Sequence, residues 1–337
     1  MSRHDKILLE HGGGGQLTGS LIEQVFMPRL GNLHLSQLTD SALVDIAGSR
    51  LCFTTDSYVV SPIFFPGGDI GSLSVHGTVN DLSVCGARPL YLSAGFIIEE
   101  GFPLEQLTAI VDSMASAAAR SKVQIVTGDT KVVPRGAADG IYINTSGIGQ
   151  YIYGAPLSPK SIAQGDAVIL NGPVGDHGAA ILCARQDLGF TTEILSDSAP
   201  IGELSQRILE AAGHVRCMRD CTRGGLGAVL AELSQQSGMD ISITEGDIPV
   251  RDSVRGVCEI LGLDPLYLAN EGKMVVICSE EDAAPVLAAM RAHELGRNAQ
   301  RIGTVRGAGR GHVVLTTIIG GERIIDRPAG ELVPRIC

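Results

Sequence analysis

Four aspartates in the first half of the chain stand at turns, at strand ends or inside an apolar helix. They are Asp40, Asp56, Asp81 and Asp129. Carboxylates that gather in space repel one another unless a hard cation neutralises them, and Mg²⁺ prefers oxygen ligands. If the fold brings these four together beside a glycine loop and Lys131, they predict a site for Mg²⁺ and ATP.

Asn80 and Asp81 lie side by side in residues 75–89, where most apolar residues recur at helical spacing. Val79 and Leu82 flank them, so the helix is expected to be largely buried there. Burying an unpaired amide or carboxylate costs several kcal/mol. Two interpretations stay open: the pair binds metal and phosphate, or it is capped or ion-paired within the fold.

Three glycine-containing loops could present backbone N–H groups to phosphate. Residues 12–15 are four consecutive glycines, which cost backbone entropy and form either a phosphate loop or a flexible terminus. Residues 176–178 begin a predicted helix, where they could bind an anion or simply provide an N-cap. Residues 220–225 combine Arg223 with a glycine pair at a helix start, which suits phosphate.

The elements that must position these residues alternate between strands and helices. Strands are predicted at 51–55, 91–98, 124–127 and 141–149 in the first half, and at 167–170 and 275–278 in the second. Asp56 and Asp129 follow two of them, and open sheets place ligand groups at the carboxyl ends of strands. The clearest helix, 103–120, has apolar residues at steps of three and four behind Pro103.

Length and composition favour two domains, with a boundary near residue 155 in the Tyr-, Gly-, Pro- and Ser-rich stretch 151–159. The glycine-rich residues 307–311 lie between two strand-like runs, which predicts a hairpin turn rather than a nucleotide loop. A hydrophobic content of 44% is ample for aliphatic cores.

The net charge of −11 argues against nucleic acid or an anionic membrane as a partner. We expect no signal peptide and no membrane-spanning helix. The eight cysteines are scattered, most of them inside apolar runs, which is typical of buried thiols in a reducing compartment. These features predict a cytoplasmic protein.

Short motifs of common enzymes are absent: there is no Walker loop, no Gly-x-Ser-x-Gly elbow and no His-Glu-x-x-His helix. Longer strings are present, namely His11-Gly-Gly-Gly-Gly, Thr55-Asp-Ser, Phe65-Pro-Gly-Gly-Asp-Ile-Gly, His76-Gly-Thr-Val-Asn-Asp-Leu, Thr127-Gly-Asp-Thr-Lys-Val-Val, Asp220-Cys-Thr-Arg-Gly-Gly-Leu, Asn270-Glu-Gly-Lys and the closing Pro-Arg-Ile-Cys. In this order, from residue 11 to residue 337, they resemble the HypE family of nickel–iron hydrogenase maturation factors, the carbamoyl dehydratases. The Asn-Asp and Gly-Asp-Thr strings alone would indicate only the wider superfamily of aminoimidazole ribonucleotide synthetase and selenophosphate synthetase.

The resemblance implies a two-domain α/β (α+β) fold whose N-terminal sheet pairs into a barrel across a homodimer. Its parts would be an ATP-binding and dimerisation domain at 1–154, an α/β domain at 155–330 and a mobile tail at 331–337. Mg²⁺ would be held by Asp40, Asp56, Asp81 and Asp129. ATP would be bound by Gly12, Gly13, Gly14, Gly15, Asn80, Asp176, His177, Gly178, Thr222, Arg223, Gly224 and Gly225.

The activity that the resemblance implies is ATP-dependent dehydration of a carbamoyl group carried on the terminal Cys337. The partner HypF would load this group, and a HypC–HypD complex would receive the cyanide for its iron. Glu271 and Lys131 are the candidates for moving protons off the amide nitrogen. An ordinary ion pair is the alternative role for either residue.

Two other functions remain possible from the sequence. The first is an ATP-dependent kinase or ligase that acts on a small molecule within the same superfamily. A selenophosphate synthetase would be expected to carry a reactive Cys near the glycine loop, whereas the nearest here is Cys52, and a thiamine-monophosphate kinase would have no use for Cys337. The second is a non-catalytic scaffold for maturation partners, which the four intact acids disfavour.

Overall fold

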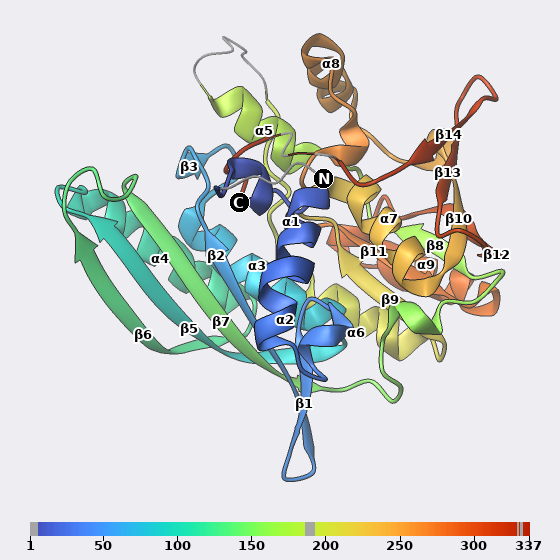
Figure 1. Cartoon of the computed structure of the whole chain (residues 1–337), viewed down its shortest axis with the longest axis horizontal. Helices are drawn as coiled ribbons and strands as arrows, with labels where there is room; N and C mark the ends of the chain where they lie inside the picture. The colour runs from blue at the N-terminus through green and yellow to red at the C-terminus, as the bar shows by residue number, and fades with distance from the viewer. Residues whose placement is uncertain (1–5, 186–192, 329, 331–332) are drawn as a thin grey trace.

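The computed structural model describes residues 6–185, 193–328, 330 and 333–337, which contain two large β-sheets and a small hairpin of β3 (Phe64–Phe65) and β4 (Gly68–Asp69) (Figure 1). The first sheet has the order β1 (Ala42–Ile46), β2 (Ser49–Tyr58), β7 (Ile141–Tyr151), β5 (Ala87–Glu99), β6 (Gln124–Val133). β5 and β6 run parallel, and all other neighbours in this sheet are antiparallel.

The first sheet has one packed face and one open face. Helices α3 (Ile70–Val84) and α4 (Leu104–Arg120) cover a single side of it (Figure 1). Along β7, Ile141, Ile143 and Thr145 are buried against these helices, whereas Asn144 and Ile148 are exposed. Because side chains on a strand alternate between faces, the exposed residues define an outer face. Over much of its length, no described residue packs on this face.

The second sheet is covered on both faces. Its order is β14 (Glu322–Ile325), β13 (Val313–Thr316), β10 (Met239–Thr244), β12 (Gln300–Ala308), β8 (Ala167–Leu170), β11 (Met274–Cys278), β9 (Val215–Asp220). Ala167 and Ile169 pack in one apolar cluster with α6 (Gly202–Ala211) and α9 (Ala283–Arg291). Val168 and Leu170 point to the other side, where they pack with α7 (Gly225–Ser237).

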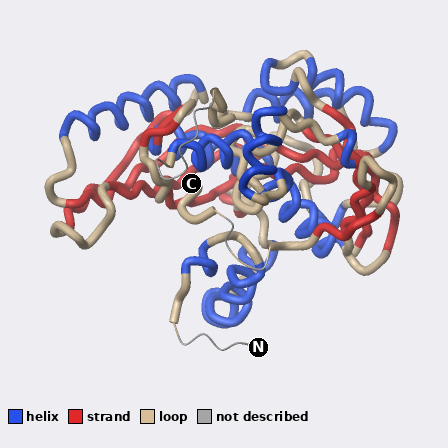
Figure 2. Tube along the Cα trace, turned by 90° about the horizontal axis from the view of Figure 1, so that it is seen from above, coloured by secondary structure: helices blue, strands red, loops and turns tan. Residues whose placement is uncertain are grey.

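Three further groups of elements complete the fold. Helices α5 (Asp176–Ala184) and α8 (Asp252–Leu261) share an apolar core with the first sheet. The N-terminal arm projects from the body (Figure 2) and comprises η1 (Leu9–Gly12), α1 (Gln16–Leu21), η2 (Ile22–Phe26), α2 (Met27–Leu30) and η3 (Leu35–Gln37). Short 3-10 turns are η4 (Pro159–Ser161), η6 (Glu245–Asp247), η7 (Pro265–Tyr267), η8 (Glu280–Asp282) and η9 (Glu294–Gly296).

Helix α3 is the element between the two halves, because it contacts β9 and α6 as well as the first sheet. It begins at Ile70, where the Asp69 carboxylate accepts hydrogen bonds from the Gly71 and Ser72 N–H groups as an N-cap. Every residue of α3 except Asp81 is buried. The helix predicted from residues 75–89 is therefore present, with a longer N-terminal part than expected.

The predicted helix at 103–120 is confirmed as α4. The hairpin predicted around residues 307–311 is wrong in one respect: the segment is a turn, but β12 and β13 do not pair with each other. Strand β10 lies between them, antiparallel to β12 and parallel to β13. Among the described residues, no helix is long and apolar enough to cross a membrane.

Candidate active site

Four aspartates meet between α3 and the second sheet. Asp40 precedes β1, Asp81 is the acid of α3, and Asp220 ends β9. Carboxylate oxygens from these three lie within 4.8 Å of one another. Asp56, on the inner face of β2, is hydrogen-bonded to Asp81 through their side chains. The predicted convergence is confirmed for Asp40, Asp56 and Asp81, and Asp220 joins them.

The electrostatics of this cluster favour a cation. Burial, together with the negative charge of the neighbouring acids, raises the pKa of Asp81 and of Asp220 well above 3.8. Burial also raises the pKa of Asp40, although Arg219 opposes this with an ion pair whose Nη1–Oδ1 distance is 2.6 Å. A hard divalent cation would replace the protons that these carboxyls otherwise keep, so the donor set fits Mg²⁺.

Asp129 and Lys131 do not join the cluster within this chain, so a part for Asp129 in metal binding stays a prediction. Both lie on β6, where their side chains are 69% exposed and pair with each other at 2.8 Å. The register places Asp129 opposite Gly95 on the outer face, whereas Asp56 points to the inner face toward α3. The sequence showed an acid near a strand end but not the face on which it lies.

A recess of about 360 Å³, including its open mouth, extends from the cluster toward the C-terminus. Its lining consists of Asp56, Ser57, Tyr58, Gly77, Asp81, Asp220, Thr222, Arg223, Glu271 and Cys337. Two of the three predicted catalytic residues, Glu271 and Cys337, thus face the same space, and Lys131 does not.

Glu271 is buried in this recess, and among the described residues its Oε1 atom has no hydrogen-bond partner. Burial and the charge of Asp220 raise its pKa well above 4.5, although Arg223 opposes the shift. The charge on Cys337 is the main cause that raises the pKa of Arg223 itself. The recess therefore combines a carboxyl able to hold a proton with a guanidinium beside the terminal residue.

The terminal residues 333–337 are docked, whereas the sequence predicted a mobile tail. The Val59 N–H donates to the Cys337 carbonyl oxygen and the Ser61 N–H donates to the Arg335 carbonyl, both at 3.1 Å. Val333 and Ile336 are buried in the core shared with the first sheet. This structure thus holds Cys337 inside the recess, and movement of the tail out of it stays a prediction.

Residues 12–15 and 222–225, predicted as phosphate loops, lie against each other at the edge of the recess. Arg223 donates from Nη1 to the Gly12 carbonyl at 3.1 Å, and Gly13 lines a narrow gap with Arg223 and Gly224. Gly225 has φ +64°, and an added Cβ would lie 2.5 Å from the Leu266 and Leu268 carbonyls. Only glycine fits this close approach at the start of α7.

Asn80 has a structural role in place of the predicted phosphate contact. Its amide donates to the Ala199 and Glu271 carbonyls at 3.0 and 3.2 Å, and its oxygen accepts from the Ile201 N–H at 2.9 Å. The second interpretation, a pair satisfied within the fold, is therefore correct for Asn80. It ties α3 to the loop that carries Glu271.

Residues 176–178 do not face the carboxylate recess. Asp176 is buried and accepts from Arg251 Nε at 3.1 Å, while burial raises its pKa to about 6. His177 lies 2.8 Å from the Ile336 carbonyl of the tail, and the Gly178 N–H donates to the Ala269 carbonyl. These contacts are with protein groups, and anion binding at residues 176–178 stays a prediction.

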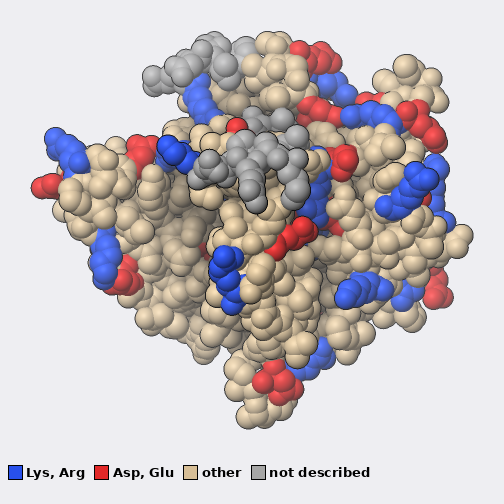
Figure 3. Space-filling view, viewed as in Figure 1, with Lys and Arg blue, Asp and Glu red and all other residues tan. Residues whose placement is uncertain are grey.

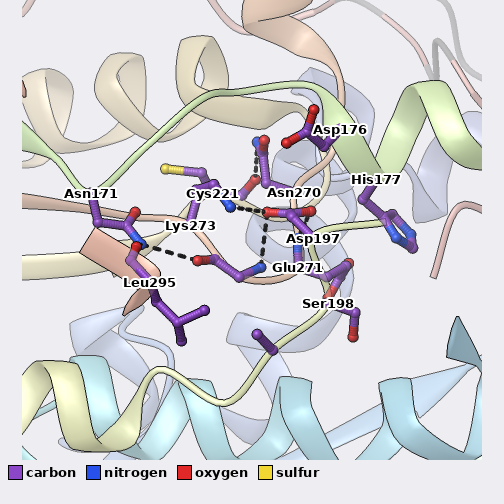
Figure 4. Close-up of polar contacts among 12 residues, drawn as sticks. Asn171, Asp176, His177, Asp197, Ser198, Cys221, Asn270, Glu271, Lys273 and Leu295 are labelled. Carbon is purple, nitrogen blue, oxygen red and sulfur yellow. Dashed lines mark hydrogen bonds and ion pairs between the residues drawn. The ribbon is translucent and has the colours of Figure 1, made fainter. Parts of the chain in front are cut away.

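Asp197, which no sequence pattern indicated, organises the loop 270–273 (Figure 4). Its carboxylate accepts from the Glu271 and Gly272 N–H groups at 3.0 and 3.2 Å and pairs with Lys273 at 2.9 Å. Burial opposes this charge, but Lys273 and the Glu271 N–H bring the pKa of Asp197 below 3.8. The acid lies in an irregular segment without a recognisable motif, so only its contacts reveal it.

Charged side chains on the face drawn in Figure 3 are of both signs and interspersed. Among the described residues on that face, no broad basic patch is present. The face therefore offers no surface of the kind that binds a nucleic-acid backbone.

Both halves of the chain match a known class of protein. The family model "AIR synthase related protein, N-terminal domain" matches residues 38–151, and the C-terminal domain of the same class matches residues 163–316. These matches define a two-domain α/β protein of the AIR synthase related class.

Relatives narrow the class further. The chain is 50% identical over 335 residues to carbamoyl dehydratase HypE of Azotobacter vinelandii, covering 99% of this chain and 98% of the relative. A solved HypE–HypF complex contains a chain 48% identical, with TM-score 0.87 and coverage of 92% of this chain and 100% of that one. HypE solved in complex with ATP is 46% identical, with TM-score 0.83 and coverage of 98% and 100%. The chain belongs to the HypE family of carbamoyl dehydratases, which act in hydrogenase maturation.

Proposed function

We propose that this chain dehydrates a carbamoyl group carried on its own Cys337, at the expense of ATP, and so converts an S-carboxamide into an S-cyanide. The observation that carries the proposal is the shared recess of Cys337, Arg223, Glu271 and the carboxylate cluster. The carbamoyl group would be attached covalently to Cys337. Hydrogen bonds from the backbone of Val59 and Ser61 hold Cys337 and Arg335 in place beside the recess. Such placement replaces a bimolecular encounter by an intramolecular one.

The carboxylates Asp40, Asp56, Asp81 and Asp220 would hold Mg²⁺, and residues 12–15 and 222–225 would lie against the ATP phosphates. When bound, Mg²⁺ neutralises charge on the phosphoryl group that is transferred. Arg223 would add a second positive charge, because it lies between the glycine loop and Cys337.

Removing water from an amide needs a leaving group better than hydroxide. Transfer of the phosphoryl group to the carbamoyl oxygen makes phosphate the leaving group, and the nitrogen must then lose two protons as the triple bond forms. Glu271 is the acceptor that the recess offers for one of these protons, because its carboxyl is buried in the recess with Cys337 and burial raises its pKa, which makes its carboxylate a stronger base; the departing phosphate can take the other proton.

We further propose that two copies pack their outer sheet faces into a barrel. Large apolar side chains are exposed on the outer face of this sheet, among them Phe53 (48%), Tyr91 (47%), Ile97 (45%) and Ile148 (40%). An exposed apolar surface of this kind is typical of a site at which another protein binds. Asp129 and Lys131 lie on the same face, so they would be turned toward the partner copy and could contribute to its site.

HypF is the partner proposed to load Cys337, in keeping with the solved complex of a relative, and a HypC–HypD complex is the proposed acceptor of cyanide. The domain limits proposed from the sequence, 1–154 and 155–330, place one large sheet in each part. A small-molecule kinase is the weaker alternative, because the tail fills the space that such a substrate would need.

The experiment is a single-turnover assay of Glu271→Gln. Carbamoylated wild type should release phosphate and lose water together after ATP is added. The variant should bind ATP normally but lose water about 100-fold more slowly, as expected when a general base is removed. A Glu271→Gln rate equal to wild type would exclude Glu271 as the acceptor, and phosphate release that needs no carbamoyl group would favour the kinase.

A further inference from the structure

One short segment contacts both the loop that carries Glu271 and the residue that binds the tail. We name residues 196–199 the strap. It lies between α5 and α6 and contacts α3, the loop 270–273 and α5 (Figure 4). The Ser196 N–H donates to the Pro66 carbonyl at 2.8 Å, which fixes one end of the strap to the β3–β4 hairpin.

The strap fixes the backbone of Glu271 on both sides. Asp197 accepts from the Glu271 N–H, and the Ala199 N–H donates to the Glu271 carbonyl at 3.3 Å. An added Cβ on Gly272 would lie 2.1 Å from the Asp197 carbonyl, so the loop and the strap are in direct contact. The position of the Glu271 carboxyl in the recess therefore depends on the strap.

The tail sets the tautomer of His177, and the strap supplies the matching donor. The Ile336 carbonyl can only accept, so His177 must donate to it from Nε2, over 2.8 Å. In the neutral ring Nδ1 is then an acceptor, and the Ser196 hydroxyl 2.8 Å away must donate to it. The Ser196 oxygen in turn accepts from the Ser198 N–H at 3.1 Å. The donor and the acceptor are therefore fixed in each hydrogen bond of this series.

We propose that His177 is a positioning residue, which holds the peptide next to Cys337 and, through Ser196 and the strap, keeps the tail in register with Glu271. The inference rests on the proposed function of Cys337 as the carrier. One continuous set of contacts would then position both the carbamoyl group on the Cys337 sulfur and its proton acceptor, Glu271. His177 itself touches neither of them: its ring lies against Phe65 and the tail backbone.

The first test measures docking of the tail without any catalysis. Iodoacetamide alkylates Cys337 when the tail leaves the recess, and cleavage after Glu331 releases the peptide 332–337 for mass spectrometry. His177→Ala should raise the alkylation rate about fivefold, the change expected when one net hydrogen bond is lost. Ser196→Ala should raise it about twofold, because His177 keeps its bond to the tail but loses its orientation.

The chain offers a matched control on the same strap. Ser198 bonds through its hydroxyl to His76 at 3.0 Å, away from the tail, and its N–H is kept in Ser198→Ala. This variant should alkylate at the wild-type rate. An equal rise in Ser196→Ala and Ser198→Ala, or a wild-type rate in His177→Ala, would overturn the proposal.

The second test uses rescue. His177→Gln retains a donor near the Ile336 carbonyl and should dehydrate a carbamoylated tail within about threefold of wild type, whereas His177→Ala should be at least about tenfold slower with unchanged ATP affinity. If His177→Gln dehydrates as slowly as His177→Ala, a hydrogen-bond donor at residue 177 does not determine the rate, and the proposal fails. If wild type itself does not dehydrate, the proposed function fails, and the alkylation rates still decide the role of His177.

Discussion

Cys337 and Glu271 line one recess, although they come from the end of the chain and from the loop before β11. Arg223 lines the same recess, and the charge on Cys337 is the main cause of its raised pKa. The proposed carrier, a cation and the proposed proton acceptor thus occur together, next to acids that suit Mg²⁺. In the proposed function, this arrangement is what activates the amide carried on Cys337.

Asp81→Asn tests the carboxylate cluster. Asp81 is the acid of α3; it is partly exposed, and it lies among Asp40, Asp56 and Asp220. Losing one carboxylate from the set should reduce Mg²⁺-dependent ATP hydrolysis at least about 100-fold, because charge on the phosphoryl group is no longer balanced. Carbamoylation of Cys337 should persist.

Phosphate release and intact mass would be measured on the same sample. Asp112→Asn, which changes an exposed acid of α4, serves as the control and should behave as wild type. Unchanged ATP hydrolysis in Asp81→Asn would exclude the cluster as the metal site.

Ile148→Glu tests the proposed barrel. Ile148 lies on β7 directly between Phe53 and Tyr91 on the outer face. A carboxylate at the centre of an apolar interface costs several kcal/mol, so the dimer dissociation constant should rise at least about 100-fold. Light scattering after size exclusion should find wild type as a dimer and the variant as a folded monomer.

Ile260→Glu is the matched control, since Ile260 lies on α8, is not part of the first sheet and is 70% exposed. A monomeric wild type, or a variant that stays dimeric at the same concentration, would contradict the barrel.

The outcome for the candidate site shows what the sequence could and could not predict. Asp81 was predictable, because a single acid amid buried apolar residues must face something polar. The position of Asp129 could not be predicted, because β6 runs to Val133 and its alternation puts the acid on the outer face. The sequence predicts that the buried Asn80 side chain has hydrogen-bond partners. Only the packing of the strap against α3 shows that these partners are backbone groups.

The fold itself was predicted more fully than the site. Regular spacing identified α3 and α4, and the string of motifs implied the two-domain class. The docked tail could not be predicted, because its hydrogen bonds use backbone atoms of Val59 and Ser61, which carry no sequence signal. The role of Asp197 could not be predicted for the same reason, since its partners are mostly main-chain N–H groups.

Asp176→Asn tests the effect of a buried acid on stability. Its pKa of about 6, against 3.8 for an unperturbed group, means that the folded state binds a proton more tightly than the unfolded state. The contribution of Asp176 to stability is therefore full below about pH 4 and lost as the pH rises through about 6. At pH 8 the variant should be more stable than wild type by about 1 to 2 kcal/mol, and at pH 4 equal to it.

Urea unfolding at the two pH values measures this difference, with Asp112→Asn as the control that should show no pH-dependent change. A stability difference that is the same at pH 4 and pH 8 would contradict the assigned pKa.

Intact-protein mass spectrometry tests the central claim most directly. The chain is incubated with the loading partner and carbamoyl phosphate, first without ATP to complete any adduct and then with ATP added. Wild type should gain about 43 Da and then lose about 18 Da, the masses of a carbamoyl group and of water. Both changes should be absent from Cys337→Ala. An adduct that ATP never dehydrates, or a mass gain that persists in Cys337→Ala, would contradict dehydration at the terminal cysteine.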